Sequence, residues 1–203
     1  MDNYFPELCE LTIPTIDRWA KKIGARLNFI TKRRWPDWPV LTEKLQVWYD
    51  GADSDWNMLI DADVLVHPDT PNMLGTFVHP AFVGAKDSYD ANKQLRQDIY
   101  FLRDGRNIGL SGCAVATSRL CHDLWRPLPE EMSIEDACAN ILQNRKIVDE
   151  YCISRNFARF GLKLTAILDP KTDYNRLFHL GSFGQDKNRI LDEARKWRAY
   201  NWK

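Results

Sequence analysis

The sequence contains no long apolar run, no excess of charge of either sign and no closely spaced pair of cysteines. Its 28 basic and 28 acidic residues give a formal net charge of zero. The chain therefore lacks the overall positive field of a nucleic-acid-binding protein, and we expect no nucleic-acid partner. Because no apolar stretch is long enough to span a bilayer and the N-terminus shows no charged-then-apolar signal pattern, we expect no transmembrane segment and a cytoplasmic location.

The number of cysteines is odd, and no two of them form a C-x-x-C pair, which argues against a disulfide framework and against a zinc cluster. Most of them stand inside apolar stretches. We interpret all five as reduced thiols in a reducing compartment: Cys9, Cys113, Cys121, Cys138 and Cys152.

The length of 203 residues suits a single domain over residues 1–203. Helical periodicity, caps and glycine stops predict helices over residues 8–23, 41–49, 133 onward, 147–160 and 185–197. Short apolar runs predict strands over residues 26–31, 56–60, 81–85, 113–117, 163–168 and 177–179. This alternation predicts an α/β domain with a mainly parallel central sheet flanked by helices.

Two acidic residues stand where a buried strand is expected to leave the sheet. Asp61 and Asp63 follow the apolar run 56–60, with one small residue between them. Carboxylates at this spacing can both turn toward one hard cation, which then bridges to phosphate oxygens. The alternative is that the two acids only solvate the end of the strand.

Two other positions offer charged groups near the expected core. On a helical wheel Asp149 and Glu150 flank the apolar stripe of residues 153, 157 and 160, so they are expected to point inward. Lys44 lies at the edge of an apolar helix face, where its ammonium either reaches into a cleft or remains in solvent. Acids in a first helical turn also suit the helix dipole, which leaves a structural role open for Asp149 and Glu150.

The runs at residues 43–46, 61–66 and 71–73 resemble the small GT-A-fold glycosyltransferases related to the glycogenin and lipopolysaccharide galactosyltransferase group. Further matching segments follow at 107–109, 149–150 and 178–181, so the resemblance covers nearly the whole chain. It implies transfer of a sugar from a nucleotide-sugar donor, usually a UDP-sugar, to a saccharide or other hydroxyl acceptor. It also implies Mn²⁺ or Mg²⁺ as the cofactor.

The resemblance assigns roles residue by residue. Asp61 and Asp63 take the metal-binding positions, and His179 completes the metal site. Asp61 is also expected to contact the nucleotide-sugar donor. Donor contacts fall to Lys44, Asn107, Gly109 and Lys187. Asp149 and Glu150 become the catalytic carboxylates, either accepting the acceptor proton or stabilising an oxocarbenium-like centre.

Several alternatives stay open. His179 is equally well a structural histidine, Lys187 a solvated lysine and Asn107-x-Gly109 a simple turn. Members of the family begin with a strand that this sequence does not show, so either the sequence starts late or the chain binds donor weakly. A nucleotide-sugar-binding protein without transfer activity is therefore one alternative function. A haloacid-dehalogenase-like phosphatase is another, because a hydrophobic strand followed by Asp-x-Asp also describes that nucleophile motif.

Overall fold

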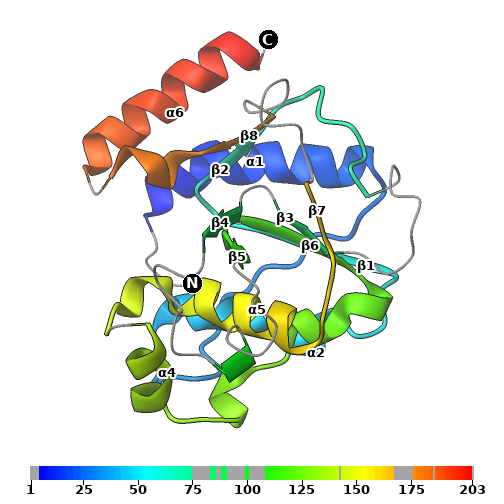
Figure 1. Cartoon of the computed structure of the whole chain (residues 1–203). Coiled ribbons are helices and arrows are strands. Elements are labelled where there is room, and N and C mark those ends of the chain that lie inside the picture. The colour runs from blue at the N-terminus through cyan, green and yellow to red at the C-terminus, as the bar shows by residue number, and fades with distance from the viewer. Residues whose placement is uncertain are drawn as a thin grey trace. The chain divides into compact units, whose positions relative to one another are not determined.

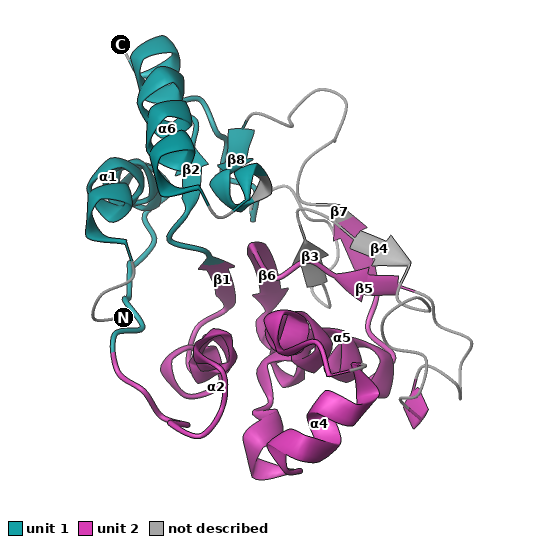
Figure 2. Cartoon of the chain, turned by 90° about the vertical axis from the view of Figure 1, so that its left-hand side faces the viewer, with its two compact units in different colours: residues 1–31, 60–76, 168–203 teal, residues 32–59, 77–167 magenta. Residues whose placement is uncertain are grey.

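The chain is seen here in a computed structural model that describes residues 5–74, 83–85, 88–90, 99–100, 108–141, 143–166, 176–184 and 186–202. Two compact units are distinguished, and each joins segments that are distant in sequence (Figure 2). Unit 1 comprises residues 1–31, 60–76 and 168–203, and unit 2 comprises residues 32–59 and 77–167. Whether residues 1–203 act as a single domain stays a prediction.

The described elements are shown in Figure 1. The α-helices are α1 (Pro6–Lys22), α2 (Val47–Asp50), α4 (Ile134–Asn140), α5 (Val148–Arg159) and α6 (Lys187–Asn201). The strands are β1 (Trp56–Ile60), β2 (Val64–Val66), β3 (Val83–Ala85), β4 (Ser88–Asp90), β5 (Ile108–Leu110), β6 (Ala114–Ser118), β7 (Leu164–Ala166) and β8 (Leu177–His179). Short 3-10 helices are η1 (Val40–Gln46), η3 (Arg119–Trp125), η4 (Leu128–Glu130), η5 (Arg145–Ile147) and η7 (Leu180–Phe183).

Unit 1 is built around the antiparallel pair β2–β8, in which Val64 lies opposite His179. Helices α1 and α6 share a core with this pair because each presents an apolar stripe to it. The buried side chains of that core are Leu8, Leu65, Leu180, Ile190, Ala194 and Trp197. All three residues of β2 are fully buried, which fixes the chain immediately after Asp63.

Unit 2 contains a four-stranded sheet in the order β1-β6-β3-β7 and the antiparallel pair β4–β5. Helix α5 is buried along most of its length. Its polar side chains bind neighbouring backbone: the Leu110 N–H donates to Ser154 Oγ at 2.8 Å, and Asn156 donates to the carbonyls of Leu124 and Arg126. These bonds satisfy polar groups that would be costly to bury alone.

Most of the predicted elements are present. Helix α1 ends as the glycine stop predicts: Gly24 has a φ of 71°, and the N–H groups of Gly24 and Ala25 bind the carbonyls of Lys21 and Ala20. Ser133 caps α4 by accepting from the Asp136 N–H. The strands at 56–60 and 177–179 are confirmed, and the α/β class is correct.

Two expectations about the sheet are wrong for the residues that the structure describes. The central sheet is not mainly parallel, since β3 is parallel to β7 but antiparallel to β6. No two strands consecutive in sequence are neighbours in that sheet, so the alternation of helices and strands could not predict strand direction. Residues 26–31 form no strand, and Phe29 is 56% exposed, because apolar and β-branched residues make a strand only where a neighbouring strand pairs with them.

The α-helix expected at 41–49 is instead mostly a 3-10 helix, η1, which is followed by the single α-helical turn α2. None of the five cysteines, all of which lie among the described residues, forms a disulfide, and four of them are buried. Burial raises the pKa of the Cys152 thiol well above its ordinary value, as expected of an inert core thiol. Within the described residues, no helix is both long and apolar enough to cross a membrane.

Candidate functional site

The Asp-x-Asp turn joins two strands. Asp61 directly follows β1, and Asp63 directly precedes the buried strand β2. The turn is closed by the Val64 N–H, which donates to the Asp61 carbonyl at 3.1 Å. The chain thus leaves regular strand geometry at residues 61–63, which lets two carboxylates of the same turn approach one point.

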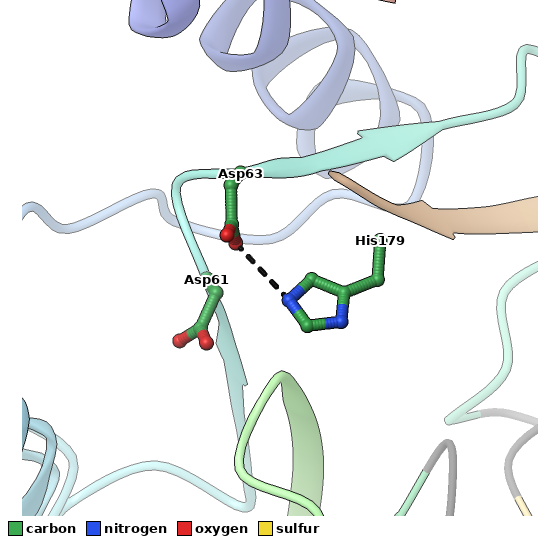
Figure 3. Close-up of side chains that lie close together, drawn as sticks. All are labelled: Asp61, Asp63 and His179. Atoms are coloured by element: carbon green, nitrogen blue, oxygen red, sulfur yellow. Dashed lines mark ion pairs between the residues drawn. The ribbon is translucent and has the colours of Figure 1, made fainter. Parts of the chain in front are cut away.

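His179 is the last residue of β8, and two backbone contacts hold it against this turn. Its ladder partner is Val64, and the next residue, Leu180, donates its N–H to the Asp63 carbonyl at 2.9 Å. The imidazole Nε2 lies 3.5 Å from Asp63 Oδ1. Figure 3 shows Asp63 facing the His179 imidazole, with Asp61 beside Asp63 on the same turn.

Asp61, Asp63 and His179 each offer one ligand atom, and these atoms lie within 4.8 Å of one another. Two ligand atoms on one divalent cation with bonds of about 2.0–2.2 Å lie at most about 4.4 Å apart, so small side-chain rotations would complete a site. The side chains of Asp63 and His179 are 14% and 25% exposed, which leaves an approach from solvent.

This set of ligands fits a divalent cation that accepts both carboxylate oxygen and imidazole nitrogen ligands. Carboxylate oxygens suit Mg²⁺ and Mn²⁺, whereas an imidazole suits the transition metals. The mixture favours Mn²⁺ over Mg²⁺, which prefers oxygen ligands throughout. Three protein ligands would leave the remaining positions of an octahedral ion for water or phosphate oxygens.

Two threonines of α1 hold the turn and its following strand, and sequence reasoning did not assign them this role. Thr12 Oγ1 lies 2.5 Å from the Ala62 carbonyl, and Thr15 Oγ1 accepts from the Val66 N–H at 2.9 Å. Both threonines are buried. Because the two threonines are three residues apart, their hydroxyls lie on one face of α1, and this shared face is the pattern that could have pointed to them.

In unit 2, Lys44 and Asp149 form a buried ion pair. Lys44 Nζ lies 2.7 Å from Asp149 Oδ2 and donates to the Gly112 carbonyl at 3.2 Å. The two side chains are only 14% and 6% exposed. The inward direction predicted for Asp149 is therefore confirmed, and Lys44 reaches the core boundary to meet it. A Cβ at Gly112 would lie 2.7 Å from Asp149 Oδ2, so the pair leaves no room for a side chain there.

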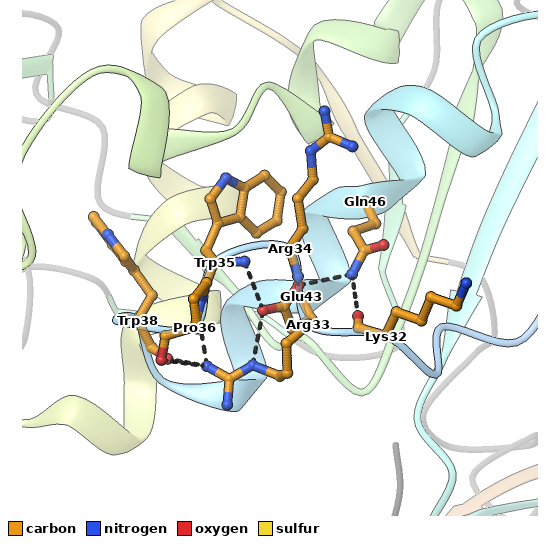
Figure 4. Close-up of polar contacts among 8 residues, drawn as sticks. All are labelled: Lys32, Arg33, Arg34, Trp35, Pro36, Trp38, Glu43 and Gln46. Atoms are coloured by element: carbon orange, nitrogen blue, oxygen red, sulfur yellow. Dashed lines mark hydrogen bonds and ion pairs between the residues drawn. The ribbon is translucent and has the colours of Figure 1, made fainter.

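A second buried carboxylate in unit 2 organises the loop before η1. Glu43 is fully buried and accepts from Arg33 Nε, the N–H groups of Arg34 and Trp35, and Gln46 Nε2 (Figure 4). The Arg33 guanidinium also donates to the carbonyls of Trp35, Pro36 and Trp38. Glu43 is a residue whose role sequence reasoning missed, because these partners are brought together only by folding.

The remaining predicted residues are distributed differently. Glu150 is half-buried in the first turn of α5, and Gly109 is buried within β5 opposite Tyr89. Lys187 is exposed at the start of α6, with its ammonium 5.0 Å from the Phe5 ring centroid. Asn107 lies outside the described residues. The structure therefore brings together Asp61, Asp63 and His179, and separately Lys44 with Asp149.

Comparisons of the chain with protein-family models, curated proteins and solved structures found no match. The relationship to GT-A glycosyltransferases is thus an interpretation of the motifs in the sequence. The site itself stands on its residues: two carboxylates and an imidazole gathered at the end of a strand.

Proposed function

We propose that the protein is a glycosyltransferase of the GT-A group that transfers a sugar from a nucleotide-sugar donor, most simply a UDP-sugar, to a hydroxyl acceptor. The observation that carries this proposal is the gathering of Asp61, Asp63 and His179 within 4.8 Å. The order of motifs along the chain, from the Asp-x-Asp turn to His179, supports it further.

In this proposal Asp61 and Asp63 supply oxygen ligands and His179 supplies a nitrogen ligand to Mn²⁺. A bound divalent cation would neutralise the negative charge that develops on the donor diphosphate as the sugar departs. The Thr12 hydroxyl and the Leu180 N–H hold the carbonyls of the same turn, so the ligands start near their working positions.

Asp149 and Glu150 are the proposed catalytic carboxylates. Either can accept the proton of the acceptor hydroxyl, or stabilise positive charge at the sugar carbon. Lys44 fixes the position of Asp149 through their ion pair. Donor contacts by Lys44, Asn107, Gly109 and Lys187 remain part of the proposal.

The test measures how much UDP, with and without Mn²⁺, stabilises the protein against unfolding by heat and by urea. Ligand at about a hundred times its dissociation constant should stabilise the wild type by roughly 2.7 kcal/mol. We expect this stabilisation to require Mn²⁺ and to disappear in Asp63→Ala. Asp69→Ala is the matched control, because the Asp69 side chain is 79% exposed outside the turn. Equal stabilisation of the wild type and Asp63→Ala would contradict the proposal.

Turnover separates the catalytic residues from the metal ligands. Asp149→Asn and Glu150→Gln should retain Mn²⁺-dependent UDP binding, and at least one of them should slow hydrolysis or transfer of a UDP-sugar. Normal turnover by both variants would remove the catalytic role from α5. Donor binding without turnover in the wild type would instead support a donor-binding protein.

A further inference from the structure

Gly181 follows His179 by two residues, in the first turn of η7, and has an unusual steric environment. A Cβ built on Gly181 would lie 2.6 Å from His179 Nε2, 2.9 Å from His179 Cε1 and 3.1 Å from Asp63 Oδ2. Real Cβ atoms essentially never show separations under 3.0 Å, so a Cβ at residue 181 would force a neighbouring group to shift. The imidazole nitrogen that faces Asp63 therefore occupies the space that a side chain at residue 181 would need.

The backbone conformation does not account for a glycine at this position. Among the described glycines, positive φ values occur at Gly24, Gly161 and Gly184, and Gly181 is not one of them. An L-residue could adopt this conformation without the strain that a left-handed backbone imposes. The position excludes a side chain because His179 fills the space beside it, and not because of its backbone conformation.

The backbone around Gly181 is held firmly, so the side chain of His179 must yield to any added Cβ. Leu180 is fully buried and its N–H binds the Asp63 carbonyl, while His179 is paired in the β2–β8 ladder. The imidazole is 25% exposed, so we expect it to rotate toward solvent when a Cβ is added at residue 181. Such a rotation would move Nε2 away from Asp63.

We propose that Gly181 is a positioning residue of the metal site: its missing side chain keeps His179 Nε2 beside Asp63, where the imidazole can bind a divalent cation together with Asp61. This inference rests on the metal role given to these residues in the proposed function. It adds that residue 181 controls metal affinity although it offers no ligand atom.

A double-mutant cycle tests the inference on the full chain: wild type, His179→Ala, Gly181→Ala and the double variant. Mn²⁺ affinity is measured from the electron paramagnetic resonance signal of free Mn²⁺, without nucleotide or sugar. We expect Gly181→Ala to weaken Mn²⁺ binding by about 10- to 100-fold, the usual loss when the support of a ligand is removed. In the His179→Ala background the same change should cause no further loss.

Two further readouts make the result specific. Urea unfolding should show nearly equal stability for the wild type and Gly181→Ala, and the imidazole resonances of His179 should shift in the metal-free variant. Unchanged affinity, equal losses in both backgrounds, or a wild type that binds no Mn²⁺ would overturn the inference. A wild type that binds Mn²⁺ but not UDP would refute the proposed donor while the cycle still supports the role of Gly181.

Discussion

Asp63 and Asp149 are both acids beside a glycine, but the side chains that face them differ. Asp149 meets the Lys44 ammonium at 2.7 Å in a nearly dry environment, whereas Asp63 faces the His179 imidazole at 3.5 Å in a partly exposed one. A separation of 3.5 Å is long for a strong hydrogen bond but ordinary for two ligands of one metal ion. The comparison indicates that the Asp149 carboxylate already has a cationic partner within the fold, whereas the Asp63 group is arranged to receive a cation.

The largest effect should come from breaking the buried pair. Lys44→Met leaves the Asp149 carboxylate buried without its ammonium partner and should lower the free energy of unfolding by roughly 3–5 kcal/mol. Urea denaturation measures this loss. Adding Asp149→Asn to Lys44→Met should recover much of it, because the buried charge is then gone. Asp63→Asn should change stability less than Lys44→Met does, and the opposite order would refute the comparison.

Glu43 is a second buried acid of unit 2, and both of its carboxylate oxygens accept hydrogen bonds from neighbouring groups. Glu43→Gln replaces one acceptor oxygen by a donor that faces the donors of Arg33, Arg34 and Trp35. We expect a loss of about 1–3 kcal/mol in unfolding free energy, the cost of leaving buried polar groups unsatisfied. Glu130→Gln serves as the control, because Glu130 is exposed and its hydrogen bond from the Tyr49 hydroxyl can still be accepted by a glutamine oxygen. Equal losses in the two variants would argue against the role of Glu43.

Glu131 is an acid whose side chain is 24% exposed, and its substitution should have the smallest effect on stability. Burial raises its pKa, but the hydrogen bond and charge of Arg159 and the charge of Arg155 outweigh burial, so the pKa lies below its ordinary value of 4.5. A lowered folded-state pKa stabilises the fold above the unfolded-state pKa, and this contribution is lost as the pH falls through the folded-state value.

The stability of the wild type should therefore fall more steeply than that of Glu131→Gln below about pH 4.5. Unfolding free energies measured between neutral and acid pH test this. Parallel pH profiles would show that the ion pairs of Glu131 with Arg155 and Arg159 do not stabilise the fold.

Local signals predicted much of this molecule. The periodicity and the glycine stop defined α1, and an apolar run followed by Asp61 predicted β1 and its turn. The sheet direction and the absence of a strand at 26–31 depend on which distant strands pair, and no local pattern carries that information.

The candidate site shows the same division. Asp61 and Asp63 are near neighbours in sequence, so their joint role could be predicted from spacing, whereas His179 was predicted from the family resemblance alone. The pairing of Lys44 with Asp149 and the steric role of Gly181 were not predicted, because both arise from contacts between residues that only the fold brings together.

The metal site is tested most directly by titrating Mn²⁺ into the wild type, Asp63→Asn and Asp149→Asn and following free Mn²⁺ by electron paramagnetic resonance. We expect one specific Mn²⁺ site in the wild type, its loss in Asp63→Asn and its retention in Asp149→Asn. Equal Mn²⁺ binding by the wild type and Asp63→Asn, or loss of the site in Asp149→Asn alone, would contradict the assignment of the metal to Asp61, Asp63 and His179.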